Sequence, residues 1–96
     1  MSPTNKKKLN LLRIKLDMLD NNLLKLIKKR SNLVNEVLKV KIHKKEIIDQ
    51  KRINNILKKI KQKSIKSNID PKITNRIWKN MIWSFIDYEK RNFKKK

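Results

Sequence analysis

The sequence contains no cysteine and no glycine, and it has a single histidine, His43. Without cysteine, the chain forms no disulfide and offers no thiolate as a nucleophile or metal ligand. Without glycine, it lacks the phosphate-binding loops of the Walker and dinucleotide types. One histidine argues against a histidine-rich metal site and against a Ser-His-Asp triad. We therefore expect neither a metal nor a cofactor.

Long apolar runs are also missing. No stretch approaches the roughly 18 uncharged apolar residues that a membrane span needs, so we expect no membrane partner. The opening residues, "MSPTNKKKLN", are basic but are not followed by the apolar run of a secretory signal. Together these observations predict a cytoplasmic protein.

Acidic residues are scarce, with 8 Asp and Glu against 28 Lys and Arg, which gives a net charge of +20. Such a charge is typical of proteins that bind nucleic acid or another anion. Compositional drift is the alternative, because the chain is rich in Lys, Asn and Ile, as expected of an AT-rich coding sequence. The lysines are scattered, and aromatic residues make up only 5%, which is little for a base-stacking surface. We therefore expect no specific nucleic-acid partner, and it stays open whether the charge is functional.

Arginine is used sparingly in a chain that otherwise takes lysine for its cations. Lysine is a point charge, whereas the planar guanidinium fork matches a carboxylate or a phosphate. Each arginine is therefore a candidate for binding a carboxylate or a phosphate. The arginines are Arg13, Arg30, Arg52, Arg76 and Arg91.

A heptad-like apolar seam runs through the first half of the chain, with alternating spacings of four and three. It predicts a helix over residues 6–42, roughly 55 Å long at about 1.5 Å per residue. The two shorter elements that remain cannot cover a seam of that length, so we expect a second copy of the chain as partner. The seam positions are Leu12, Leu16, Leu19, Leu23, Leu26, Arg30, Leu33, Val37 and Val40.

Two shorter helices are predicted after a loop at residues 43–46, "HKKE". The second helix is expected over residues 47–66 and the third over residues 71–91. Asp70 is a good N-cap for the third helix, and Pro71 suits its first position. The apolar stripes of the two helices are Ile53, Ile56, Leu57 and Ile60, and then Ile73, Ile77, Trp78, Met81, Ile82 and Phe85.

The predicted fold class is all-α, a three-helix chain with one long N-terminal helix that forms a helical homodimer. We see no internal repeat. A single domain is expected over residues 1–96, with flexible tails at residues 1–5 and 92–96.

Arg30 occupies a seam position where an apolar residue is expected. It precedes Lys41 by 11 residues, so on a helix the two differ by about 20° in azimuth and lie roughly 16 Å apart along the axis. Val34 and Val37 lie between them on the same stripe, and two long cations over an apolar floor suit a small dianion. Arg13 lies about 100° around the helix from Arg30, so in an antiparallel or crossed dimer it would serve the partner's pocket.

Two acidic residues complete this constellation. Glu89 extends the inward stripe of the third helix, and a buried Glu is rare unless it is paired or functional. Asp49 and Arg52, at i and i+3, share a face of the second helix. Structural explanations stay open: an Arg30–Glu89 salt bridge, a surface position for Lys41, and a helix cap at Asp49.

Three segments resemble the all-helical chorismate mutases: "LRIKLDMLDNNLLKLIKKRSNLVNEVLKVK", "IIDQKR" and "IDPKITNRIWKNMIWSFIDYE". The resemblance runs from about Leu12 to Glu89. Its most specific part is an Arg-x6-Asp pattern followed by a further Arg and a Lys eleven residues later. It implies an intertwined homodimer, with the long first helices paired and two active sites that each use both chains. It also implies the activity, the rearrangement of chorismate to prephenate in aromatic amino acid biosynthesis.

Carried over position by position, the resemblance implies specific roles. Arg30, with Arg13 supplied by the partner chain, would bind the carboxylates of the substrate, and Arg52 would help to hold one of them. Lys41 would donate to the ether oxygen of the breaking bond. Asp49 would bound the pocket at the substrate hydroxyl, partly through its backbone.

Three of the substrate-lining positions depart from the family pattern. Glu89 stands where the family usually has Gln, the second donor to the ether oxygen. Ile53 replaces a Glu that usually contacts the substrate hydroxyl, and Phe85 replaces a Ser. A slip of one residue would use Ser84 and Tyr88 instead, but it would bring an asparagine into the core stripe, so we prefer the register with Phe85.

The predicted catalytic residues are therefore Lys41, Glu89 and Arg30. The lost polar contacts leave room for an isochorismate pyruvate lyase or for a non-catalytic member of the same fold. The alternative of another class is a basic helical dimer that binds nucleic acid.

Overall fold

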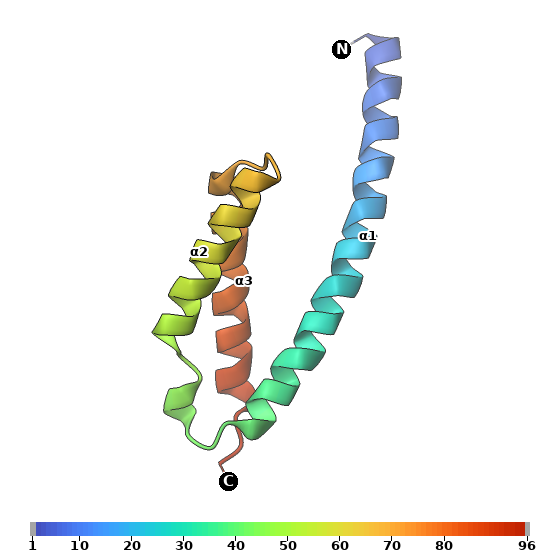
Figure 1. The fold of residues 1–96 in the computed structure, drawn as a ribbon. Coiled ribbons are helices and arrows are strands. Elements are labelled where there is room, and N and C mark those ends of the chain that lie inside the picture. The colour runs from blue at the N-terminus through green and yellow to red at the C-terminus, as the bar shows by residue number, and fades with distance from the viewer. Residues whose placement is uncertain (1, 96) are drawn as a thin grey trace. The chain divides into compact units, whose positions relative to one another are not determined.

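The computed structural model describes residues 2–95, which form three α-helices and one short 3-10 helix (Figure 1). The elements in order are α1 (Pro3–Val40), η1 (Lys44–Glu46), α2 (Gln50–Lys66) and α3 (Pro71–Asn92). No strand occurs in the described residues. The prediction of an all-α chain with one long N-terminal helix is confirmed.

Helix α1 begins earlier and ends earlier than its apolar pattern predicted. Ser2 caps it, because its Oγ accepts a hydrogen bond from the backbone N–H of Asn5 at 3.2 Å, and Pro3 suits a first helical turn. Helix therefore extends into the predicted tail at residues 1–5, of which residue 1 lies outside the described residues, as does residue 96 of the other tail. At the far end, Lys41 follows the helix, and its N–H donates to the carbonyl of Leu38 at 3.2 Å.

Helix α2 begins three residues later than predicted, because Asp49 acts as its N-cap. The Asp49 carboxylate accepts a hydrogen bond from the N–H of Arg52 at 3.0 Å. The residues before it form a connecting segment in which Ile47 is buried, only 4% exposed. The apolar side chain that suggested an earlier start thus joins the core from outside the helix.

A Schellman motif closes α2 without the glycine that usually occupies its left-handed position. Asn68 takes that position with φ of 57°. The N–H of Ile69 donates to the carbonyl of Ser64 at 2.9 Å, and the N–H of Asn68 donates to the carbonyl of Ile65 at 3.2 Å. Asparagine is the usual substitute for glycine in this conformation, and the chain contains no glycine. The predicted Asp70 cap and Pro71 start of α3 follow at once.

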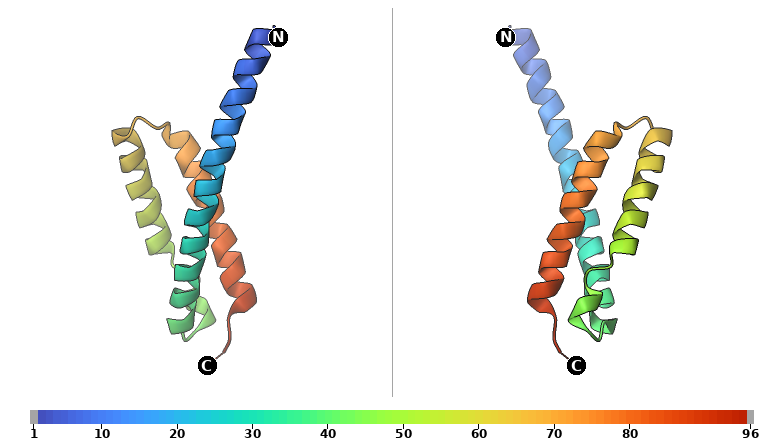
Figure 2. Two further views of the ribbon diagram at one scale, coloured as in Figure 1. Left: turned by 90° about the vertical axis from the view of Figure 1, so that its right-hand side faces the viewer. Right: turned by 90° about the vertical axis from the view of Figure 1, so that its left-hand side faces the viewer.

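Helices α2 and α3 pack against each other as an antiparallel hairpin (Figure 2). Near the turn, the hydroxyls of Ser64 and Thr74 lie 2.7 Å apart, and both residues are buried. The core forms at the other end of the hairpin. It consists of Ile47, Ile53, Ile82 and Ile86, with Leu38, Ile56, Leu57, Trp78 and Phe93 packed around it. The predicted stripe of α2 is confirmed as the inward face of that helix.

The chain divides into two compact units, one ending at Leu33 and the other beginning at Val34. In the first unit the apolar seam of α1 is exposed, from 53% at Leu23 to 66% at Leu33. None of the described helices combines the length and the apolar composition that a membrane crossing requires. Two predicted inward positions of α3 are wrong for this single chain, because Ile73 and Ile77 are more than half exposed.

The left-handed backbone conformation of Asn68 can be used to test the turn between α2 and α3. Replacing Asn68 with valine is expected to lower the free energy of unfolding by about 1–2 kcal/mol, because a β-branched residue is strained at positive φ. Asn68→Gly is expected to match or exceed the wild type. Urea unfolding at fixed protein concentration, followed by helical circular dichroism, measures the difference. A valine variant as stable as the wild type would contradict the assigned turn.

Candidate active site

A buried ion pair joins the residue that follows α1 to the last turns of α3. Lys41 Nζ donates to Glu89 Oε2 at 3.0 Å. The two side chains are 17% and 8% exposed, so water screens their attraction far less than it would at the surface. The predicted inward orientation of Glu89 is present in the structure, and Lys41 is not the surface lysine of the structural alternative.

A second polar contact lies beside the ion pair, and the sequence pattern did not indicate it. Tyr88 donates its hydroxyl hydrogen to Asn35 Oδ1 at 2.8 Å, and both side chains are half-buried. Tyr88 directly precedes Glu89, and Asn35 lies on the same helix that leads to Lys41. The contact therefore fixes the two backbones from which the ion pair projects. An asparagine three residues before the core-packed Leu38 was the available signal.

The last turns of α1 present two different faces. Val34, Asn35 and Leu38 are half-buried, and Leu38 packs against the core. The seam residues Val37 and Val40 are 47% and 74% exposed. The apolar floor predicted from Val34 and Val37 is therefore divided, with Val34 turned inward and Val37 still accessible. The ion pair lies at the border between a packed face and an open apolar face.

The start of α2 places three predicted site residues in different environments. Asp49 is exposed and caps the helix through the N–H of Arg52, so the capping alternative is present. The Arg52 side chain is exposed. Ile53 is 6% exposed and belongs to the core. The position where the family pattern has a hydroxyl-binding Glu has thus become part of the apolar packing.

Burial along α3 supports the preferred register. Phe85 and Met81 are half-buried, whereas Ser84 and Asn80 are exposed. The Ser84 hydroxyl donates a hydrogen bond to the carbonyl of Asn80 at 2.7 Å. The inward stripe therefore passes through Phe85 and reaches Glu89 one helical turn later.

Arg13 and Arg30 belong to the first unit, and their positions relative to the ion pair stay predictions. Arg30 is half-buried, and Arg13 is exposed. The alternative of an Arg30–Glu89 salt bridge stays open beside this ion pair, in which Lys41 supplies a cation to the Glu89 carboxylate.

The ion pair offers one cation and one carboxyl group at a place where water is scarce. A lysine ammonium has three N–H donors, so Lys41 can bond Glu89 and an oxygen of a ligand at the same time. A carboxyl group in its protonated form is also a donor. The described residues contain no cluster of three or more His, Cys, Asp or Glu side chains that would hold a metal ion.

A protein-family model described as chorismate mutase type II matches residues 12–90 of the chain. The matched span includes all the positions to which the resemblance assigned roles, from Arg13 to Glu89. No match was found among curated proteins, and none among solved structures.

Removing one partner of the ion pair is expected to cost more than removing both. Lys41→Met leaves the Glu89 carboxylate buried without its cation, which lowers the free energy of unfolding by about 2–3 kcal/mol. The double variant Lys41→Met/Glu89→Leu is expected to recover most of that loss, because no charge is left in the apolar site. Denaturant unfolding without substrate, at one protein concentration, measures all three proteins. A double variant at least as unstable as Lys41→Met would contradict the interaction of the two groups.

Proposed function

The chain belongs to the chorismate mutase type II family, and from this premise we propose that it catalyses the rearrangement of chorismate to prephenate. The observation that carries the proposal is the buried contact between Lys41 and Glu89, 3.0 Å apart. It unites the two positions, 48 residues apart, that the family pattern places at the ether oxygen. The proposed place in metabolism is the synthesis of phenylalanine and tyrosine, and the cytoplasmic location stays a prediction.

The proposed reaction is unimolecular. One carbon–oxygen ether bond of chorismate breaks while one carbon–carbon bond forms, and no atom is gained or lost. The protein therefore has to supply conformational restraint and charge rather than a nucleophile. Holding both substrate carboxylates selects the compact conformer in which the reacting carbons approach each other, which is an orientation effect.

Lys41 has the central electrostatic role in this proposal. As the ether bond breaks, negative charge develops on its oxygen, and a cation beside it stabilises the transition state more than the ground state. The 3.0 Å contact with Glu89 holds the ammonium group in place before the substrate arrives. This preorganisation lets Lys41 act without a costly rearrangement during the reaction.

Glu89 has a role that depends on its proton. An ionised Glu89 next to the ether oxygen would oppose the developing charge, whereas a protonated Glu89 would donate a hydrogen bond to it. Turnover is therefore expected to follow the fraction of enzyme in which Glu89 carries a proton.

The substrate carboxylates are assigned to arginines. Arg30 and Arg52 would bind them from one chain, and Arg13 would come from a second copy. The exposed seam of α1 supports that second copy, because an apolar stripe of this length is normally covered in a stable protein. In the proposed homodimer, each site therefore combines residues of both chains.

Ile53 and Phe85 bear on which substrate is used. With Ile53 in the core, Asp49 at the start of α2 is the remaining polar candidate for the substrate hydroxyl. This loss of polar contacts keeps isochorismate pyruvate lyase as the second candidate. Release of pyruvate from isochorismate, with chorismate left unchanged, would favour the lyase over the mutase.

Mixing two inactive variants tests the shared site. Arg13→Ala and Lys41→Ala are each expected to abolish turnover while the helical circular dichroism survives. When the two are unfolded and refolded together, half of the dimers are mixed and each mixed dimer has one intact site. About a quarter of the wild-type activity should therefore return, measured as the loss of chorismate absorbance.

The matched control for that mixture pairs Lys41→Ala with Arg30→Ala. Both residues are assigned to the same chain's contribution, so every mixed site lacks one of them and no activity should return. Recovery in the control, or its absence in the Arg13 mixture, would contradict the assignment of Arg13 to the opposite chain. Lys41→Ala that keeps its turnover would remove Lys41 from the mechanism.

The proton on Glu89 predicts the pH dependence of the enzyme. Turnover should rise as the pH is lowered, because the protonated carboxyl donates to the ether oxygen. Glu89→Gln supplies a permanent donor, so it should flatten the profile and raise the activity at neutral pH. The measurement is the rate of chorismate loss at saturating substrate over a series of pH values.

Glu36→Gln is the control for this experiment, because Glu36 forms an exposed ion pair with Lys39 at 3.3 Å. It removes a carboxylate of the same type without touching the site, and the profile should keep its slope. A flat profile in the wild type would exclude the proposed role of Glu89.

A further inference from the structure

One face of α3 carries three cations and an exposed tryptophan that the proposed chorismate site does not use. Lys72, Arg76, Lys79 and Trp83 follow one another at spacings of four, three and four, which places them on one side of a helix. All four are exposed, and Trp83 has 42% of its surface accessible. The charged part spans about 10 Å along the helix axis. In the single chain, an exposed tryptophan at the end of a cationic row is available for contact with a ligand.

The row continues across the surface onto α2 through two hollows. They have Lys72 and Asn75 in common, so they form one continuous track, defined here as the α2–α3 track. No carboxylate lines either of these hollows, which lie within the described residues. One is lined by Leu57, Lys58, Lys61, Pro71, Lys72 and Asn75, and the other by Lys72, Asn75, Arg76, Lys79 and Asn80.

The surroundings of the track add almost no negative charge. Asp70 is the sole acidic residue between Gln50 and Ile86 in the sequence, and the next one, Asp87, lies one helical turn beyond Trp83 at the far end of the row. The Asp70 carboxylate accepts a hydrogen bond from the backbone N–H of Lys72 at 2.9 Å as the cap of α3. The track therefore presents a local positive field, and asparagine amides beside it offer neutral hydrogen-bond donors.

The presence of Arg76 argues that the α2–α3 track is more than the result of a composition that has drifted toward lysine. The chain takes lysine for most of its cations, and the chorismate assignment accounts for Arg13, Arg30 and Arg52 but not for Arg76. At the middle of the row, a guanidinium fork flanked by two lysines matches the oxygens of a phosphate. Drift toward lysine does not explain an arginine that stands at this place.

We propose that the α2–α3 track binds a single strand of nucleic acid. The phosphates lie along Lys72, Arg76 and Lys79, and one base stacks on Trp83. Backbone neutralisation combined with an aromatic platform is the usual way in which proteins hold single strands without reading their sequence. A duplex keeps its bases stacked inside and would leave Trp83 without a role, so the aromatic favours the single strand. This activity is independent of the proposed mutase reaction.

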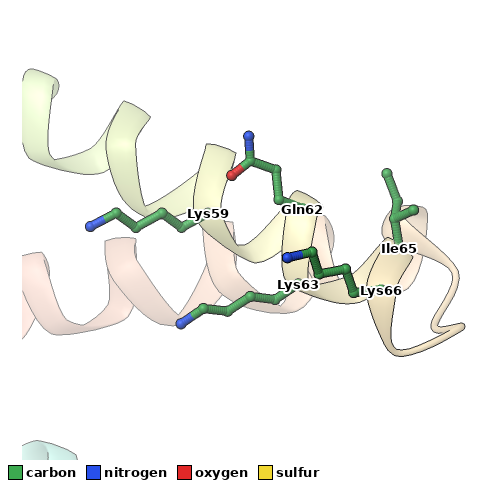
Figure 3. A pocket seen from close by; sticks show the side chains of 5 residues that line it. All are labelled: Lys59, Gln62, Lys63, Ile65 and Lys66. Carbon is green, nitrogen blue, oxygen red and sulfur yellow. The ribbon is translucent and has the colours of Figure 1, made fainter.

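A third hollow, outside the track but on the same hairpin, serves as the matched control (Figure 3). Its lining, Lys59, Gln62, Lys63, Ile65 and Lys66, comes from α2 alone. The ammonium ends of its three lysines trail toward the start of α2, and the hollow includes neither an arginine nor an aromatic residue. It is an example of the positive charge that a composition drifting toward lysine produces on a solvent-exposed helix face.

Two triple variants with the same net charge distinguish binding at the α2–α3 track from binding by the overall positive charge of the protein. One is Lys72→Gln/Arg76→Gln/Lys79→Gln, and the control is Lys59→Gln/Lys63→Gln/Lys66→Gln. Binding to a fluorescent oligothymidylate of about 15 nucleotides is measured by anisotropy from about 50 to 200 mM salt. The track variant should lose at least about tenfold more affinity than the control at about 100 mM salt. Its slope of log K against log salt should become shallower by about 2, as expected for three lost phosphate contacts.

Equal losses in the two variants would overturn the track and leave only bulk charge. Helical circular dichroism and chorismate turnover are measured in parallel. Both should match the wild type in the two variants, since none of the changed residues belongs to the proposed active site. A track variant that has lost its helical signal is replaced by the single change Arg76→Lys, which keeps the charge but removes the fork. It should still bind several-fold more weakly than the wild type, and unchanged binding would refute the role of Arg76.

Trp83 is tested by its own fluorescence. In a Trp78→Phe background Trp83 is the remaining tryptophan, and the oligothymidylate should quench its emission at the same concentrations at which it binds. Trp83→Leu should weaken binding several-fold without changing the salt slope, because stacking is not ionic. A duplex of equal length that binds more tightly than the single strand, or binding without quenching, would refute the proposal.

Discussion

The attraction between the ammonium group of Lys41 and the carboxylate of Glu89 is the constraint on which the second unit depends. Both charges sit where water is scarce, and each would be costly there without the other. The pair ties the chain that leaves α1 to the final turns of α3, and the Tyr88–Asn35 contact repeats that tie one residue away. The helices of a small core are thereby held in register by polar groups that a substrate can also use. In the proposed mutase, stability and function would draw on the same atoms, so a change at either residue would affect both.

The fold places this pair at the edge of the apolar core rather than inside it. Ile47, Ile53, Ile82 and Ile86 form a core too small to bury the surface of a long helix. Leu38 contributes to it from α1, while the seam residues Val37 and Val40 stay accessible. Such a division of one helix into a packed side and an open side is what a site shared between two copies requires. Ile53 belongs to the apolar core at a position where the family pattern has a residue that contacts the substrate.

The sequence alone was sufficient for the larger features because they rest on local rules. Helical periodicity predicted three helices, and the Asp70–Pro71 pair predicted the start of the third. The first helix ends two residues earlier than predicted, at Val40. The start of the second was placed three residues too early, because Ile47 continues the apolar pattern while serving the core from a connecting segment. Ile73 and Ile77 were predicted inward, since periodicity identifies an apolar face but not what covers it. The Lys41–Glu89 contact was not predicted, because it joins residues 48 positions apart and no local rule pairs them.

The accessible seam of α1 has a consequence for how catalytic capacity responds to the amount of protein made. If each site needs two chains, the concentration of sites at low expression rises with the square of the chain concentration and becomes linear only once pairing saturates. A modest decrease in protein synthesis would then reduce the total activity more than it would for a monomeric enzyme. In that case newly made chains would also expose the apolar seam of α1 until they met another copy, and the interval before pairing would be their most vulnerable stage.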